Sequence, residues 1–205
     1  MRNDKIWQDF YQNKKGRSLK KTQYAQKFLK KEHAKILELF MANGSNISML
    51  KSKNKNATVY GIDNDKKLCE QARKKGYKTI NCDCKNMKLK ENSFDFIYCN
   101  SFHHCSSSFN QIFNKTIKLL KKNGILVGVE PYGNLARTLH FITSLIPDAI
   151  ISVMPKKEYI RTLKHEVKQD NVLNWYNTNF KKTIREQKLI NYKRDLLGIW
   201  YCIRK

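Results

Sequence analysis

Five polar side chains stand at or near the ends of short apolar runs in the first two thirds of the sequence. They are Glu38, Asp63, Asp83, Asn100 and Glu130. Ligands of open parallel sheets bind outside the carboxyl ends of the strands, so these side chains are expected to meet at one edge of such a sheet. Asp63 is the most specific, because an acid that ends the second strand, about 20 residues after a glycine-containing turn, is placed to accept ribose hydroxyls. Its alternative role is to cap the following helix.

Histidines near the same edge are candidates for proton transfer. His103 and His104 come shortly after Asn100, and histidine titrates near neutral pH, so either could act as a general base. The alternative is that both histidines hydrogen-bond locally and shape their loop. Further candidates for contact with a substrate are Trp7, Tyr11, Glu130, Tyr132 and His140. Trp7 and Tyr11 would fold over a ligand as a lid, or else pack against the sheet.

Continuous apolar runs predict the strands that would position these side chains. The runs cover residues 35–40, 57–63, 78–82, 94–100 and 124–130, and helical periodicity appears between them, at residues 65–75 and 109–122. Strands without polar alternation, separated by helices, indicate a parallel sheet that is covered on both faces. Residues 183–190 and 196–203 read as two successive strands, which predicts an antiparallel pair at the end of the sheet.

The sequence therefore predicts an α/β fold: a doubly wound, mostly parallel, Rossmann-like sheet with a C-terminal antiparallel strand pair. Residues 1–34 read as one or two basic amphipathic helices that form a lid. Residues 35–205 read as one domain, with a mostly helical insertion at about residues 134–179 that would supply an acceptor pocket.

The charge of the chain is large but spread out. Lys and Arg number 41 against 17 Asp and Glu, a formal net charge of +24, and most of the basic residues are lysines. Lysine is a solvated point charge rather than the bidentate reader of phosphates and bases that arginine is. A solvated basic surface is therefore favoured over a nucleic-acid interface, while an anionic small molecule remains compatible as a substrate.

Nothing in the sequence predicts a metal site, a membrane span or a secreted protein. The six cysteines include no Cys-x-x-Cys pair, and Cys82-Asp83-Cys84 reads better as buried or loop thiols than as metal ligands. The start of the chain lacks a signal-peptide pattern, and the apolar stretch at 139–154 is broken by Pro147 and too short to span a bilayer. We expect a protein of the reducing cytoplasm.

Residues 36–130 resemble the core of the class I S-adenosylmethionine-dependent methyltransferases, of the small-molecule type often called methyltransferase-11-like. The resemblance rests on Val59-Tyr60-Gly61-Ile62-Asp63, on Asp83-Cys84, on Asn92-Ser93-Phe94-Asp95-Phe96-Ile97, and on Asn100-Ser101-Phe102-His103-His104. Residues 119–126, which approach the fifth strand, are similar to the corresponding family segment. The order and spacing of these motifs are more specific than any one of them.

The resemblance implies that S-adenosylmethionine is the cofactor and assigns roles around it. Glu38 would anchor the methionine amino end, Gly44 would let the backbone approach the cofactor, and Asp63 would accept both ribose hydroxyls. Asp83 would meet the adenine amino group beside the Cys84 amide. The carbonyl of Asn100 would hold the methionine ammonium. The acceptor is expected to be a small molecule.

The glycine-rich motif departs from the family pattern of an acid followed by three alternating glycines. Here the segment is Glu38-Leu39-Phe40-Met41-Ala42-Asn43-Gly44, so only the acid and the last glycine match. Side chains at Phe40 and Ala42 stand where the family has bare backbone. This departure leaves open a non-catalytic relative that serves as an interaction protein. The basic ends of the chain leave open a second alternative, an RNA or protein methyltransferase that uses the basic surface.

Overall fold

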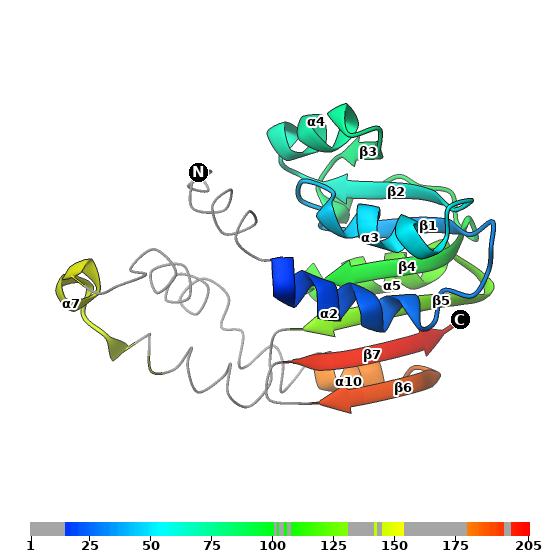
Figure 1. The fold of residues 1–205 in the computed structure, drawn as a ribbon. Coiled ribbons are helices and arrows are strands. Elements are labelled where there is room, and N and C mark those ends of the chain that lie inside the picture. Colours follow the sequence, from blue (N-terminus) through cyan, green and yellow to red (C-terminus); the bar gives the residue numbers. More distant parts are fainter. Residues whose placement is uncertain are drawn as a thin grey trace.

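The computed structural model describes residues 15–100, 102, 105, 108–130, 142, 145–153, 180–194 and 198–205. These residues form a twisted sheet with helices packed on both of its faces (Figure 1). Among the described residues, no helix combines the length and apolar character needed to cross a membrane.

Seven strands make up the sheet, in the order β3-β2-β1-β4-β5-β7-β6. The first five run parallel, whereas β7 pairs antiparallel with both β5 and β6. Their bounds are β1 Lys35–Leu39, β2 Thr58–Asp63, β3 Lys78–Asn81, β4 Phe94–Asn100, β5 Leu120–Glu130, β6 Leu189–Arg194 and β7 Ile199–Arg204. The chain moves outward from β1 to β3 and then returns to β4, so the strand order reverses between β1 and β4. That reversal is the switch point at which ligands of open α/β sheets bind.

The helices divide between the two faces of the sheet. Their bounds are α2 Lys15–Gln26, α3 Ser45–Lys53, α4 Lys66–Lys74, α5 Phe109–Leu119, α7 Asp148–Val153 and α10 Lys181–Arg185, with a short 3-10 turn, η1, at Cys84–Asn86. Buried residues of α2, α3 and α4 join one apolar cluster, and those of α5, α10 and η1 join the other. The mostly parallel sheet with its C-terminal antiparallel pair thus confirms the predicted fold.

The pleat of β1 decides which face each of its side chains occupies. Leu37 and Leu39 pack in the cluster on the α5 side, while Ile36 packs in the cluster on the α2 and α3 side. Because strand side chains alternate between faces, Glu38 lies on the α2 and α3 side, where it is fully buried. An acid is thereby placed inside a face that is otherwise apolar.

Two element boundaries differ from the sequence-based prediction. The sequence predicts a strand over residues 183–190, but the structure has α10 at Lys181–Arg185 and begins β6 only at Leu189. Ile184 is buried on α10 beside Phe180, so packing of one helical turn overrides the local strand pattern. The predicted helix at 109–122 ends at Leu119, and β5 begins at Leu120 rather than at Gly124.

The N-terminal segment and the insertion are described only in part. Of the predicted lid at residues 1–34, the structure describes residues 15–34, which include α2; Thr22 and Ala25 of this helix are fully buried, so α2 packs on the sheet. Within the predicted insertion it describes α7 and a few neighbouring residues, with Ile150 and Val153 exposed. The remainder of both segments lies outside the described residues.

Candidate functional site

The turn after β1 keeps the backbone of a glycine-rich loop although two of its three expected glycines are replaced. The φ angles are 56° at Phe40, 50° at Ala42 and 77° at Gly44, all in the left-handed region. L-residues other than glycine pay about 1–2 kcal/mol each for this conformation. Backbone hydrogen bonds fix the turn, from Met41 N–H to the Ile62 carbonyl (3.0 Å) and from Gly44 N–H to the Met41 carbonyl (3.0 Å). The strained loop is therefore held by the end of β2.

Gly44 has a packing role as well as a conformational one. It precedes α3, and a Cβ at this position would lie 2.9 Å from Cδ2 of Tyr77. A side chain would therefore displace the Tyr77 ring in addition to straining the backbone. The Phe40 ring meets the buried Phe102 ring edge to face, with centroids 6.2 Å apart. Phe40 therefore packs at the border of the apolar cluster on the α5 side.

Asp63 ends β2 and binds the strained turn directly. Its Oδ2 accepts a hydrogen bond from Ala42 N–H (2.9 Å), and its Oδ1 accepts one from Asp65 N–H (2.9 Å). The helix-capping role belongs instead to Asp65, whose Oδ1 accepts the Leu68 N–H at the start of α4. Asp63 therefore ties the end of β2 both to the turn after β1 and to the start of α4.

Glu38 is the most perturbed acid of this region. It is fully buried, its Oε1 accepts a hydrogen bond from Asn46 Nδ2 (2.8 Å), and its Oε2 has no hydrogen-bond partner among the described residues. Burial raises the pKa of Glu38 to about 8, opposed by the Asn46 hydrogen bond and reinforced by the negative charge of Asp63. A buried acceptor without a partner is costly, and at this place it is available to a cationic or donating ligand group.

Sheet register brings Glu38, Asp63 and Asn100 together. Leu39 of β1 is in register with Ile62 of β2 and with Cys99 of β4. Asp63 and Asn100 each come directly after those partners, so they flank the position where the chain leaves β1. Neighbouring strands lie about 4.8 Å apart, which places the three side chains at one edge.

Helix α2 adds contacts that the sequence did not reveal. Lys21 Nζ donates to Asn100 Oδ1 (2.9 Å), and Thr22 Oγ1 donates to Asn46 Oδ1 (3.4 Å). Asn46 is in turn the partner of Glu38. The sequence feature that could have indicated these contacts is Thr22, a polar residue three positions before Ala25 on the buried face of α2. α2 therefore contributes a cation and one polar side chain to the site, the latter bonded to Asn46 of α3.

Asp83 and Cys84 occupy the turn after β3. Asp83 is exposed, and its Oδ1 accepts the Lys85 N–H (2.8 Å) at the start of η1. Cys84 is buried, and burial raises the pKa of its thiol well above the usual range, so it is a neutral thiol at physiological pH. All six cysteines are free thiols.

Glu130 ends β5 inside the protein and holds the loop after β4. It is fully buried, and its Oε1 accepts the Phe102 N–H (2.8 Å). Phe102 is itself fully buried against Phe109 and Phe113 of α5. Glu130 therefore fixes the residue that immediately precedes His103.

Six other predicted site residues, Trp7, Tyr11, His103, His104, Tyr132 and His140, lie outside the described residues. Around the end of β1, the site offers the carboxyl groups of Glu38 and Asp63 and the ammonium group of Lys21, and Oε2 of Glu38 has no partner among the described residues. These groups suit a ligand that carries hydroxyls and an ammonium group together with a carboxylate.

Comparison with known proteins identifies the core of the chain. Residues 36–124 match the family model described as a methyltransferase domain. No curated protein gives a significant sequence match.

Solved structures share the fold at low sequence identity. The plantazolicin methyltransferase BpumL in complex with SAH has a TM-score of 0.63 and 16% identity, covering 98% of this chain and 90% of that chain. A Methanococcus maripaludis protein proposed to be an S-adenosyl-L-methionine-dependent methyltransferase has a TM-score of 0.60 and 16% identity, covering 90% and 83%. The PH0226 protein from Pyrococcus horikoshii OT3 has a TM-score of 0.59 and 16% identity, covering 87% and 84%. Residues 36–124 are therefore a methyltransferase domain, in a chain that has the fold of class I S-adenosylmethionine-dependent methyltransferases.

Proposed function

We propose that this protein binds S-adenosylmethionine at the carboxyl ends of β1, β2 and β4 and transfers its methyl group to a small-molecule acceptor. The observation that carries the proposal is the meeting of buried Glu38 with Asp63 and Asn100 around a loop whose backbone stays left-handed at Phe40, Ala42 and Gly44. Retention of this strained conformation without the usual glycines supports a loop shaped for a ligand rather than for stability.

The residues present fit the cofactor. The partnerless Oε2 of Glu38 is a buried acceptor that an ammonium group would satisfy. Asp63, a carboxylate that ends β2 beside the strained turn, is the acceptor that we assign to the ribose hydroxyls. Lys21, already at Asn100, supplies a cation for the carboxylate of a methionine moiety. Asp83 and the Cys84 amide are proposed to meet the adenine ring.

Each residue then has a binding or positioning role. When bound, S-adenosylmethionine supplies a methyl group on a sulfonium, which is already activated for transfer. Glu38 and the Asn100 carbonyl would orient the ammonium end, and Asp63 would orient the ribose. Through its hydrogen bond to Phe102 N–H, Glu130 would position the segment in which His103 and His104 follow. One of these histidines would accept the proton of a hydroxyl or amine acceptor, and orientation of that acceptor for in-line attack would supply most of the rate.

The insertion at about residues 134–179 is proposed to enclose the acceptor, together with Trp7, Tyr11, Tyr132 and His140. An anionic acceptor, such as a phosphorylated sugar, suits the positive charge of the chain. KedS8 from Streptoalloteichus has a TM-score of 0.53 and 13% identity, covering 62% of this chain and 54% of that chain. It is named a sugar N-methyltransferase, and BpumL is named a plantazolicin methyltransferase. That precedent supports the same class of acceptor here.

Calorimetric titration with S-adenosylmethionine and with its demethylated product tests the proposal. We expect one site per chain for both ligands and at least tenfold weaker binding by Asp63→Asn. Asp65→Asn, which alters the neighbouring helix cap but keeps the backbone N–H that Asp65 donates to Asp63, is the matched control. Absence of binding, with a melting temperature unchanged at millimolar cofactor, would overturn the proposal in favour of a non-catalytic relative.

A further inference from the structure

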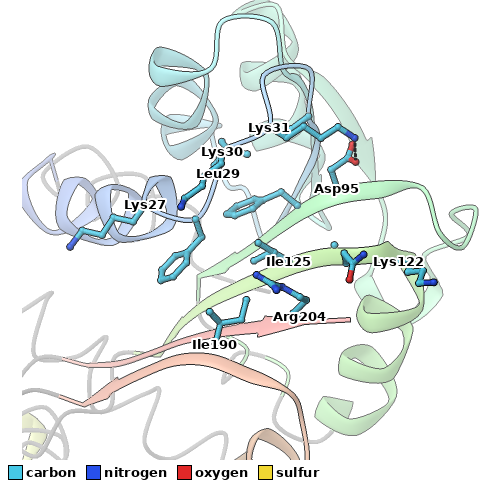
Figure 2. A pocket seen from close by; sticks show the side chains of 14 residues that line it. Lys27, Leu29, Lys30, Lys31, Asp95, Lys122, Ile125, Ile190 and Arg204 are labelled. Atoms are coloured by element: carbon cyan, nitrogen blue, oxygen red, sulfur yellow. Dashed lines mark hydrogen bonds and ion pairs between the residues drawn. The ribbon is translucent and has the colours of Figure 1, made fainter.

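A cavity at the opposite edge of the sheet has no part in the proposed methyl transfer. We call it the basal pocket; its volume is about 520 Å³, and its walls come from the 27–34 connector between α2 and β1, from β4 and β5 near their amino ends, from Ile190 and from Arg204 (Figure 2). Strands β1, β4 and β5 are parallel, so their amino ends lie at the edge remote from Glu38 and Asp63. At about 3.3 Å per residue, the strands separate the two edges by roughly 15–20 Å.

Positive charge converges on this pocket from three separate parts of the chain. Lys27, Lys30 and Lys31 come from the connector, Lys122 from the start of β5, and Arg204 from the end of β7. Asp95 is the acid in the lining, and it is already paired with Lys31 (2.6 Å) and with Lys121 (2.9 Å).

The other four cations have no carboxylate partner among the described residues. Lysines at the end of a helix often complement the negative end of its dipole, which would account for Lys27 just after α2. That explanation does not reach Lys122 and Arg204, because these belong to strands. The pocket therefore carries uncompensated positive charge.

The walls between these cations are apolar. Phe28, Leu29, Ile125 and Ile190 line the pocket, and Ile190 is 39% exposed. The Phe28 ring is held edge to face against Tyr24, with centroids 5.2 Å apart. Simple counterions need no apolar wall, so the combination indicates a ligand with a flat or apolar body and anionic groups at its margin.

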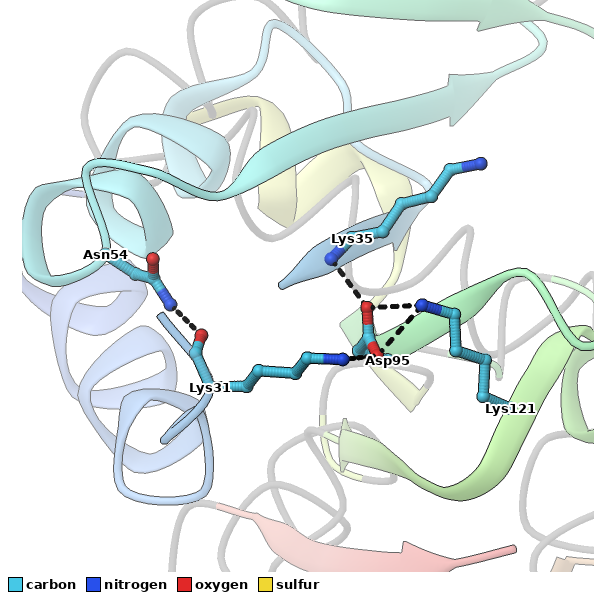
Figure 3. A network of polar contacts seen from close by, with 5 residues as sticks. All are labelled: Lys31, Lys35, Asn54, Asp95 and Lys121. Carbon is cyan, nitrogen blue, oxygen red and sulfur yellow. Dashed lines mark hydrogen bonds and ion pairs between the residues drawn. The ribbon is translucent and has the colours of Figure 1, made fainter. Parts of the chain in front are cut away.

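The connector that forms one wall is fixed in place. The Lys31 carbonyl accepts a hydrogen bond from Asn54 Nδ2, while its ammonium group and the Lys35 N–H (2.9 Å) both donate to Asp95 (Figure 3). The backbone carbonyl and the side-chain ammonium group of Lys31 are thus hydrogen-bonded to different elements. A pre-arranged wall lowers the ordering cost of binding.

A second hollow continues the basal pocket along the connector. It has a volume of about 500 Å³, shares Leu29 and Lys30 with the first, and adds Glu32, Ser52, Asn54, Lys55 and Asn56. The acid among them, Glu32, accepts a hydrogen bond from Asn56 Nδ2 (3.0 Å). The two hollows together exceed the needs of one mononucleotide. A ligand that repeats the same unit would occupy both.

We propose that the basal pocket binds single-stranded nucleic acid, with a base against Phe28 and its neighbours and phosphates against Lys27, Lys30, Lys122 and Arg204. Proteins of this kind combine a basic groove with aromatic side chains on which bases stack. Because the pocket lies at the edge remote from the methyl-transfer site, a nucleotide bound there is an anchor and not the methyl acceptor. The inference goes beyond the proposed function and does not depend on it.

Fluorescence anisotropy with a labelled twelve-residue oligouridylate tests the proposal. Four phosphate contacts predict that log K falls with log salt at a slope of about −2.8, and Lys122→Gln with Arg204→Gln lowers that slope to about −1.4 and weakens binding about 25-fold at 0.1 M salt. The matched control is Lys66→Gln with Lys74→Gln, two exposed lysines of α4 that give the same loss of charge. We expect this control to stay within about twofold of wild type.

Two further probes separate base recognition from charge alone. Phe28→Leu keeps an apolar side chain but removes the stacking ring, and we expect about tenfold weaker binding from the loss of one stacked base. Circular dichroism and thermal melting check that the variants fold. Equal weakening by the pocket and control pairs overturns the proposal, as does equally tight binding of inorganic polyphosphate of matched charge. Equally tight binding of uridine monophosphate overturns the assignment to a strand. Cofactor titration of the pocket variants, expected to match wild type, keeps this outcome separate from the proposed function.

Discussion

The charge state of Glu38 gives the sharpest test of the site, through the substitution Glu38→Gln. Burial raises the pKa of this carboxyl to about 8 from an ordinary value of 4.5, so the folded protein keeps a proton that the unfolded chain loses. Between these two pH values the folded state binds more protons, and the free energy of unfolding must therefore fall as pH rises. This pKa difference corresponds to a loss of about 5 kcal/mol in the free energy of unfolding once the pH has risen to about 8. Glutamine has nearly the shape of the protonated acid and cannot ionise.

Urea unfolding of wild type and Glu38→Gln at pH 5 and pH 8 measures this effect. We expect the two proteins to differ by less than about 1 kcal/mol at pH 5, where Glu38 is protonated in the folded state. At pH 8 the variant should be the more stable by several kcal/mol, because only wild type then carries the cost of its buried carboxyl. Glu91→Gln is the control, since this side chain is 61% exposed and its loss should leave the pH profile unchanged. Parallel pH profiles for wild type and Glu38→Gln would refute the reasoning.

Cofactor binding should strengthen as the pH rises, whereas the free energy of unfolding falls. An ammonium group at Oε2 favours ionised Glu38, so binding by wild type should release a proton and strengthen up to tenfold from pH 6 to pH 7. Glu38→Gln should bind more weakly and without this pH dependence. Calorimetry in two buffers of different ionisation enthalpy measures the released proton. No proton release by wild type would show that Glu38 does not meet a cationic ligand group.

Four further changes test other parts of the structure. Asp63→Asn should weaken S-adenosylmethionine binding about 10- to 100-fold in calorimetry, because hydrogen bonds to a charged acceptor are lost; unchanged affinity would remove Asp63 from the site. Ala42→Gly should raise the free energy of unfolding by about 0.5–1 kcal/mol because φ is 50°, whereas Ala57→Gly, at a buried alanine without positive φ, should lower it by about 1 kcal/mol; equal signs would argue against strain in the loop. Asp95→Asn should lower the free energy of unfolding at pH 7 by about 1–3 kcal/mol. Burial opposes ionisation of Asp95, but the hydrogen bonds from Lys31, Lys35 N–H and Lys121 hold its pKa below the usual range. The stability difference between wild type and Asp95→Asn should therefore shrink as the pH falls through that lowered pKa. A difference that persists in acid would contradict the assignment. His104→Asn should reduce kcat with little change in cofactor affinity and remove the pH dependence that an ionising base gives to kcat, and His103→Asn provides the comparison.

The strands of the sheet were predictable because short runs of apolar residues indicate which segments are buried. A strand covered on both faces needs a largely apolar run, and such runs occur at the positions of β1, β2, β4 and β5, whereas the edge strand β3 is only partly buried. Residues 183–190 were not predictable in the same way. Ile184 is buried in the apolar cluster on the α5 side, together with residues of β1, β4 and β7 that are remote in sequence, and no local pattern reveals this packing. Local propensity and tertiary packing therefore conflict there, and packing decides.

Some residues of the candidate site were predictable from local sequence, and others depend on tertiary packing. The strand-end residues Glu38, Asp63 and Asn100 were predictable, because parallel strands present their carboxyl ends at one edge whatever the details of packing. The contacts from α2 were not, since Lys21 and Thr22 are separated from their partners Asn100 and Asn46 by 79 and 24 residues. The cavity at the amino ends of the strands also joins residues remote in sequence, from Lys27 to Arg204.

The sequence by itself determined the alternation of strands and helices, the acids at the strand ends and the family they resemble. Only the tertiary structure decided how those acids behave. It placed Glu38 on the face covered by α2 and α3, where burial raises its pKa, and it bonded Asp63 to the turn that Phe40 and Ala42 strain. Hydrogen-bonding capacity belongs to the residue type, but desolvation and backbone strain depend on every neighbour, and the neighbours are set by the fold.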